Sequence, residues 1–193
     1  MGLSEEMRED INAAVQTMRR GGVIVYPTDT IWGIGCDARN ADAVKRIYQI
    51  KQRADSKALI CLVSSLEMLD ATVGDVPEVA EQLIEAAVDP VTIVYDHGRG
   101  VAPDLLASDG SLGVRLTREA FSAALCSAMR GPIVSTSANI SGQPAPRDFI
   151  SIPRTIIEAA DYVCTSRRDE PAALKASSVI KISSGGLFQI LRK

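Results

Sequence analysis

The sequence predicts one α/β domain built on a mixed, twisted sheet. Short apolar runs of strand length alternate irregularly with segments whose apolar residues recur at helical spacing. The last two apolar runs are joined by a short glycine-containing turn, so they must pair antiparallel and the sheet is mixed. Because 193 residues suit a single domain, we expect residues 1–193 to form one unit.

The N-terminal segment predicts a helix followed by a buried strand. Ser4 can cap the helix, and Gly21-Gly22 ends it. The run Val23–Tyr26 is typical of a strand buried on both faces, and Pro27 ends this strand because it cannot donate to the ladder. The polar residues 28–30 then follow the carboxyl end of a strand, where open α/β sheets usually bind ligands.

The remaining elements follow from the same signals. A helical region is expected over residues 65–88, with an interruption near Gly74 and Pro77. Earlier in the chain, Gly33 and Gly35 suggest only that the backbone passes close to a neighbouring segment. Other helices are expected at 41–51, 118–129 and 152–160, and other strands at 58–63, 91–95, 112–116, 133–135, 162–165, 179–182 and 188–191.

Composition limits the classes of function. The net charge of −3 argues against a general basic coat for nucleic acid. No apolar run approaches the length of a membrane span, and the charged N-terminus does not resemble a signal peptide, so we expect a cytoplasmic protein without a membrane partner. The widely spaced cysteines, without a CxxC pair, predict reduced core thiols rather than a metal or redox site. The single histidine, His97, has no local metal-ligand partner.

A basic cluster is the strongest electrostatic feature. Lys51, Arg53 and Lys57 lie close together, with Lys45 and Arg46 just before them. Cations at this spacing repel one another unless an anion or carboxylates lie among them, which indicates a local anion site. A solvated basic surface is the alternative from charge alone.

Hydroxyl and amide groups follow two of the predicted strands. Ser135, Ser137 and Asn139 in STSAN could donate to phosphate or ribose oxygens, or could simply form a turn. If the chain stays extended, Thr28 and Thr30 face one way and the intervening Asp29 the other, and a Ser/Thr turn is the alternative.

Two strand residues could point into a cavity. Thr92 and Arg115 lie in predicted strands, and a buried arginine would need an anionic partner, whereas one at a sheet edge would need nothing. No triad, P-loop or metal-ligand cluster is evident in the sequence.

Together these residues resemble the YrdC-like family of threonylcarbamoyl-AMP synthases. The resemblance is carried by GGVIVYPTDTIWGIGCDA, KQRADSKALI, DPVTIVY, SLGVRLT and PIVSTSANISGQPAP, and it runs from about Met7 to the C-terminus. Its specific signature is KxR followed about eighty residues later by SxN. It implies a single YrdC-like domain of the short form, an open twisted mixed sheet flanked by helices around a concave basic cavity.

The resemblance also implies site residues and a reaction. The enzyme would be a nucleotidyltransferase that converts L-threonine, bicarbonate (or CO2) and ATP into threonylcarbamoyl-AMP and pyrophosphate, with Mg2+ arriving on ATP and no dedicated protein ligand for it. Threonine would be bound by Thr28, Thr30, Arg115 and Ser135. The nucleotide would be bound by Lys51 and Arg53, which are also the implied catalytic residues, together with Lys57, Thr92, Ser137, Asn139, Ser177 and Arg192.

The implied product feeds a separate transferase complex, which moves the threonylcarbamoyl group to an adenosine of tRNA. Whether tRNA or double-stranded RNA is a direct partner stays open. The alternatives are an RNA-binding module without catalysis and another carbamoyl- or acyl-phosphate-handling enzyme on the same fold. Asp89, where the family often has glycine, and Ala54, where it often has proline, leave the local loop geometry open.

Overall fold

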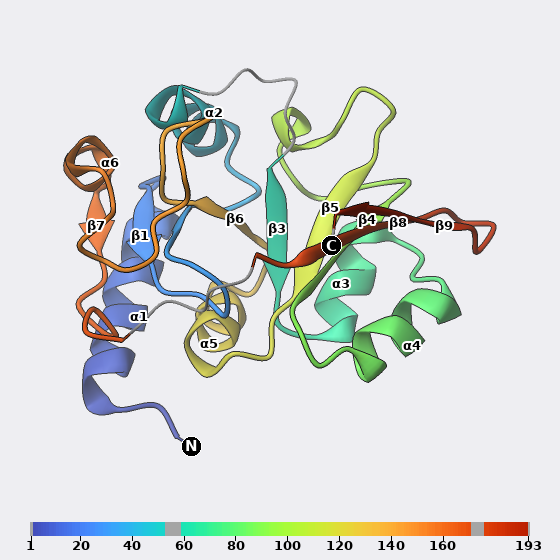
Figure 1. Cartoon of the computed structure of the whole chain (residues 1–193), viewed down its shortest axis with the longest axis horizontal. Coiled ribbons are helices and arrows are strands. Elements are labelled where there is room, and N and C mark those ends of the chain that lie inside the picture. The colour runs from blue at the N-terminus through green and yellow to red at the C-terminus, as the bar shows by residue number, and fades with distance from the viewer. Residues whose placement is uncertain (1, 53–58, 171–175, 193) are drawn as a thin grey trace.

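One mixed sheet organises the chain (Figure 1). The computed structural model describes residues 2–52, 59–170 and 176–192. In these residues the strands are β1 (Ile24–Tyr26), β2 (Gly33–Gly35), β3 (Ile60–Val63), β4 (Val91–Tyr95), β5 (Leu112–Leu116), β6 (Ile133–Ser137), β7 (Tyr162–Val163), β8 (Ser178–Ile182) and β9 (Phe188–Arg192). Their order in the sheet is β7-β1-β2-β6-β3-β5-β4-β8-β9.

The strand pairing confirms the predicted mixed sheet. The pairs β1–β7, β3–β5 and β4–β8 are parallel, whereas β1–β2, β2–β6, β3–β6, β4–β5 and β8–β9 are antiparallel. The closing hairpin of β8 and β9 is antiparallel as predicted, and it lies at one edge of the sheet.

The helices begin and end where local signals place them. They are α1 (Glu5–Arg19), α2 (Ala41–Lys51), α3 (Leu66–Val73), α4 (Glu78–Ala86), α5 (Ala120–Met129) and α6 (Arg154–Ala159), with a 3-10 turn η1 (Pro103–Leu105). Ser4 caps α1 by accepting from the Met7 amide at 3.2 Å. Gly74, at φ 84°, ends α3, so the predicted interruption of the 65–88 region is confirmed. Helix α5 starts at Ala120 because Glu119 caps it.

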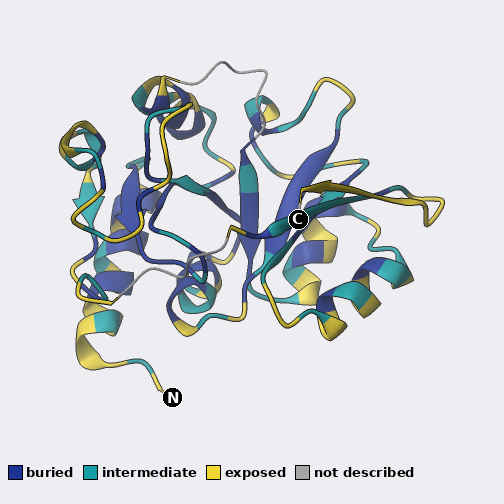
Figure 2. Cartoon of the chain, in the orientation of Figure 1, coloured by how far each residue is buried: buried dark blue, intermediate teal, exposed yellow. Residues whose placement is uncertain are grey.

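The two faces of the sheet differ because side chains alternate along each strand. Cys61 pairs with Val114 and Val134, and these buried residues share the face covered by α3 and α5. The neighbouring Ile60 pairs with Gly113 and Ser135 on the opposite face. Figure 2 shows the central strands buried, whereas β9 at the edge is exposed and β8 is partly buried. The opposite face, with its small and polar residues, is where the cavity described below opens.

Gly33 and Gly35, for which the sequence predicted only a close backbone path, lie in strand β2. This strand pairs with both β1 and β6. A Cβ at Gly35 would lie 2.2 Å from the Val134 carbonyl oxygen and 2.9 Å from the Tyr26 ring. Both contacts are too short for any side chain, so the close backbone path that the glycines suggested lies within the sheet itself.

The four cysteines are buried and form no disulfide, as expected of core thiols. Burial raises the pKa of the Cys61 thiol to about 12, which keeps it protonated and unreactive. In the part of the chain that the structure describes, no helix has both the length and the apolar character to cross a membrane.

Candidate functional site

A cavity of about 400 Å3 opens on one face of the sheet. It is bounded by the loop after β1, by β4, β5 and β6, and by the closing hairpin. Its lining brings together eight of the residues predicted from the sequence, Thr28, Thr30, Thr92, Arg115, Ser135, Ser137, Ser177 and Arg192. Among the described lining residues the only charged ones are two arginines, so the wall suits a polar anionic ligand.

A threonine pair forms one end of this cavity. The hydroxyls of Thr28 and Thr30 lie 3.1 Å apart, and both residues are buried. Thr28 Oγ1 donates to the Ile31 carbonyl at 2.7 Å and accepts from the Thr30 amide at 3.0 Å. The segment is therefore a Ser/Thr turn rather than extended, and this turn is what brings both hydroxyls to the cavity wall.

A buried ion pair stands beside the threonine pair. Arg115 Nη2 lies 2.9 Å from Asp29 Oδ1, and only 4% of the Arg115 side chain is exposed. Burial raises the pKa of the Asp29 carboxyl, and the Arg115 guanidinium opposes that rise. The sequence argument that a buried arginine would need an anionic partner is confirmed, and Asp29 is that partner.

Hydroxyl groups also line the opposite end of the cavity. Thr92 Oγ1 and Ser177 Oγ lie 2.8 Å apart, and both residues are buried. The Ser177 carbonyl accepts from Arg192 Nη2 at 2.9 Å and from Nε at 3.3 Å. Strand β9 therefore places an arginine on the cavity wall, and Ser177, directly before β8, supplies a hydroxyl.

The STSAN segment divides between the cavity and its support. Ser135 and Ser137 line the cavity, as does the intervening Thr136. The Asn139 side chain instead donates to the Ile140 and Gln143 carbonyls at 3.1 and 2.6 Å. Asn139 therefore holds the loop that follows β6 and does not itself line the cavity.

Lys51 lies beside the cavity rather than on its wall. Its ammonium donates to the carbonyl oxygens of Ser137 and Asn139 at 2.5 and 2.8 Å, and the residue is 1% exposed. The basic cluster is thus not one continuous surface, because Arg46 pairs with Asp161 at 2.5 Å elsewhere. Arg53 and Lys57, which the sequence also assigned to the nucleotide, lie outside the described residues.

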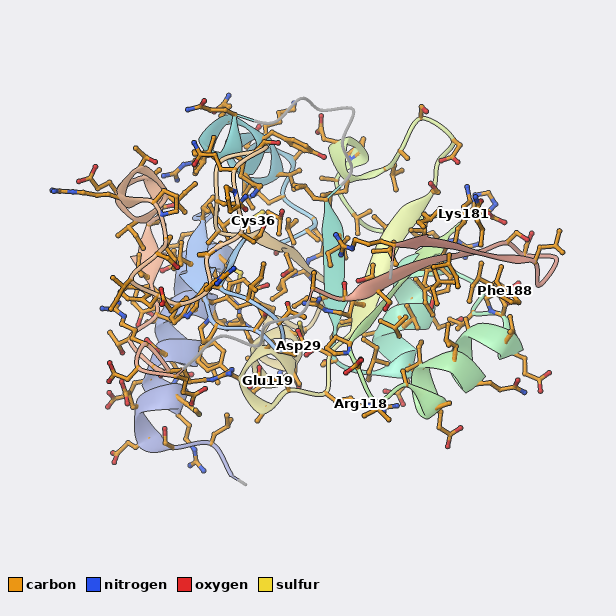
Figure 3. The ribbon with its side chains drawn as sticks, in the orientation of Figure 1. Asp29, Cys36, Arg118, Glu119, Lys181 and Phe188 are labelled. Atoms are coloured by element: carbon orange, nitrogen blue, oxygen red, sulfur yellow. The ribbon has the colours of Figure 1, made fainter. Side chains whose placement is uncertain are left out.

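Sequence reasoning did not assign Ser111 or Thr136 to the site, and it left the partner of Arg115 unnamed. Ser111 lines the cavity, and its hydroxyl donates to Asp109 at 2.6 Å. Asp29 was expected to face away from the threonines, and it does line a separate cavity of about 180 Å3 together with Asp89, Arg118 and others. Figure 3 shows Asp29 and Glu119 near the start of α5. Strand alternation could have placed Ser111, but the ion pair depended on a long-range contact.

Metal ligation is not suggested by the described residues. Within them, no group of three or more His, Cys, Asp or Glu is arranged to hold a metal ion.

Taken together, these features define an α/β protein whose open mixed sheet carries a polar, arginine-containing cavity. Comparison with known proteins identifies the family. The chain belongs to the Sua5/YciO/YrdC family, whose model carries the description telomere recombination and matches residues 16–193.

Similar proteins of this family carry informative names. A threonylcarbamoyl-AMP synthase of Xanthomonas campestris is 37% identical over 158 residues, covering 80% of this chain and 84% of the relative. E. coli YciO shares the fold with a TM-score of 0.82 at 25% identity, over 100% of this chain and 91% of that one.

A second solved structure was determined with a ligand. P. abyssi Sua5 complexed with L-threonine has a TM-score of 0.80 at 26% identity, over 93% of this chain. This chain spans about half of that protein, since the match covers 52% of it.

Proposed function

We propose that this protein makes threonylcarbamoyl-AMP and pyrophosphate from L-threonine, bicarbonate or CO2, and ATP, and is therefore a nucleotidyltransferase. The names of its relatives and the threonine complex of P. abyssi Sua5 support the proposal. The observation that carries it is the cavity of about 400 Å3, with paired threonines and Arg115 at one end and Thr92, Ser177 and Arg192 at the other.

The size of the cavity suits two ligands side by side. Arg115 lies on β5 and Arg192 on β9, and these strands are three steps apart in the sheet order. Adjacent strands are separated by about 4.8 Å, so the two backbones lie roughly 14 Å apart. An amino acid at the Arg115 end and a nucleotide toward the Arg192 end could therefore meet between them.

In the proposed reaction the threonine amine adds to CO2 and loses a proton, which gives an N-carboxylate. One oxygen of this carboxylate then attacks the α-phosphorus of ATP, and the bond to pyrophosphate breaks. The main barrier is the electrostatic repulsion between the two approaching anions. Cationic side chains reduce this repulsion, and holding both substrates in one cavity makes their reaction effectively unimolecular. Mg2+ would accompany the triphosphate as part of the substrate.

The protein supplies positions and charges for this reaction. The Thr28 and Thr30 hydroxyls can receive the polar groups of threonine, and Arg115 can pair with its carboxylate. Ser135 lines the cavity and completes the proposed threonine site, whereas the Ser137 hydroxyl could meet phosphate or ribose oxygens of the nucleotide. Lys51 would act in part through the loop whose carbonyls it binds, whereas the proposed role of Arg53 rests on the KxR motif alone.

The product would pass to a separate transferase that modifies an adenosine of tRNA. Because ATP, threonine and tRNA meet in the cytoplasm, we place the protein there. The proposal requires that the product reaches this transferase, and it does not require direct contact between this protein and tRNA.

The decisive test is product formation. Purified protein with ATP, labelled L-threonine and bicarbonate should yield labelled threonylcarbamoyl-AMP and pyrophosphate in equal amounts. Pyrophosphate release should depend on threonine, and a reaction without threonine is the control. Absence of both products from folded protein would reject the proposal. Salt-dependent RNA binding in the absence of any ATP or threonine binding would instead favour a binding module.

A further inference from the structure

We propose that Asp29 is a positioning residue that holds Arg115 in the orientation required to bind the substrate carboxylate. This inference rests on the proposed function, because it concerns a residue that supports the proposed threonine-binding arginine of the same site. The ion pair joins Arg115 Nη2 to Asp29 Oδ1 at 2.9 Å, and the exposed side-chain fractions are 4% and 14%. A charge this deeply buried is held in place by its partner, since an unpaired guanidinium would be strongly disfavoured there.

The two cavities show on which side each partner acts. Arg115 lines the cavity of about 400 Å3, and Asp29 is absent from that lining. Asp29 lines the neighbouring cavity of about 180 Å3, and Arg115 is absent from that one. The ion pair therefore belongs to the wall between them. A ligand in the larger cavity would meet the guanidinium, with the carboxylate behind it.

The contact between Arg115 and Asp29 is an ion pair that leaves donor capacity on the guanidinium. Arg115 Nε is buried and, like Asp29 Oδ1, has no hydrogen-bond partner among the described residues. A guanidinium presents its N–H groups in a rigid planar fork, so fixing one nitrogen sets the direction of the others. Asp29 thus determines where the free edge of Arg115 points.

The other charged groups near Asp29 bind partners other than Arg115. Glu119 and Arg167 are the other charged groups that act on Asp29. Both carboxylate oxygens of Glu119 accept amide hydrogen bonds at the start of α5, at 2.9 and 2.8 Å. Arg167 pairs with Glu119 at 3.1 Å and with Glu170 at 2.7 Å. Asp29 is the carboxylate that pairs with Arg115.

The first test is the Asp29→Asn variant, which keeps the shape of the side chain and removes its charge. The KM for threonine should rise about tenfold or more, while kcat falls less than about threefold and the KM for ATP stays within about twofold. Threonine affinity measured by calorimetry should fall in parallel, and this readout does not require turnover. A threonine KM within about twofold of wild type would overturn the inference, as would an equal rise for ATP.

A matched control exists in the same chain. Asp37 pairs with Arg39 at 2.8 Å, and neither residue lines the cavity; the Asp37 side chain is 15% exposed, close to the value for Asp29, although Arg39 is 42% exposed. Asp37→Asn should therefore leave both KM values unchanged. If Asp37→Asn raised the threonine KM as much as Asp29→Asn, the effect would be a general loss of an ion pair and the inference would be wrong.

A double-mutant cycle decides the case even if Asp29→Asn alone does not fold. Arg115→Gln removes the other charge, so the double variant leaves no unpaired charge buried. Because Asp29 acts through Arg115, adding Asp29→Asn to Arg115→Gln should not weaken threonine binding further. Additive losses would overturn the inference. Wild type that binds threonine without forming product would reject the proposed synthase and leave the role of Asp29 intact.

Discussion

At the scale of single residues, two buried carboxylates show how surroundings decide the behaviour of one chemical group. Burial raises the pKa of Asp29, and the single Arg115 partner opposes the rise. Burial would also raise the pKa of Asp10, but hydrogen bonds from Ser166, Tyr162 and Thr165 outweigh it and lower that pKa. Asp10 thereby ties helix α1 to the segment that follows β7.

We expect Asp10→Asn to destabilise the fold by about 2–3 kcal/mol at neutral pH. Hydroxyl and backbone N–H donors that now bind the carboxylate would meet the NH2 group of asparagine. The Tyr162 hydroxyl and the Ser166 amide donate to the Asp10 carboxylate at 2.5 Å each. Since folding lowers this pKa, the stabilisation is complete above the unfolded value of about 4 and is lost as pH falls through the folded pKa.

Urea unfolding of both proteins at neutral pH and at about pH 3 checks this prediction. The gap in free energy of unfolding between wild type and Asp10→Asn should narrow on acidification. Glu9→Gln, an exposed neighbour on the same helix, is the control and should change little. A gap that stays constant across this range would contradict the assignment of the stabilisation to the charged carboxylate.

At the scale of elements, strand β2 is the piece that joins the two sides of the sheet. It lies between β1 and β6, and without it the threonine turn would lose its connection to the STSAN strand. The Cβ of an alanine at position 35 would meet the Val134 carbonyl oxygen at 2.2 Å, so the strands would have to separate.

Gly35→Ala should therefore lower the free energy of unfolding by about 1–3 kcal/mol, the usual cost of overpacking a dense interior. Chemical denaturation measures the loss. Gly185→Ala is the matched control, because the nearest atom to its Cβ is 4.0 Å away, and we expect a change within about 0.5 kcal/mol. Equal stabilities for the two variants would show that β2 has room to adjust.

The same strand shows where sequence reasoning stops. Most helices and strands followed from apolar periodicity and capping residues, and the mixed sheet followed from the closing hairpin. Gly33–Gly35 carries no such pattern. Its strand conformation results from pairing with the flanking strands β1 and β6. Lys51 is similar, since its carbonyl partners lie 86 and 88 residues away, and a lysine in a basic run gives no local sign of burial.

The candidate site was predictable from the sequence to about the same extent as the fold. Residues within strands, such as Thr92 and Arg115, reached the cavity because strand position and alternation determine where they point, whereas Thr28 reached it through a turn. The pairing of Arg115 with Asp29 was predictable only as the need for some anionic partner. Which carboxylate meets that need depends on tertiary contacts that no local pattern contains.

At the scale of the whole molecule, the cavity depends on distant parts of one sheet. Its lining comes from the turn after β1, from the central strands β4, β5 and β6, and from the β8–β9 edge. The edge hairpin is the least buried part of this assembly (Figure 2). A ligand that contacts these separate parts at once would bind the folded chain and not the unfolded one.

Substrate binding should therefore raise the temperature of unfolding. A ligand at about 100 times its Kd adds about 2.7 kcal/mol to the free energy of unfolding, which corresponds to roughly 5–10 °C for a chain of this size. Thermal unfolding with L-threonine, with ATP and with both should show this shift, and D-threonine at equal concentration serves as the control. At a fixed threonine concentration, Asp29→Asn should shift less than wild type, whereas its shift with ATP should match. An unfolding temperature that responds to neither substrate would mean that this cavity does not bind them.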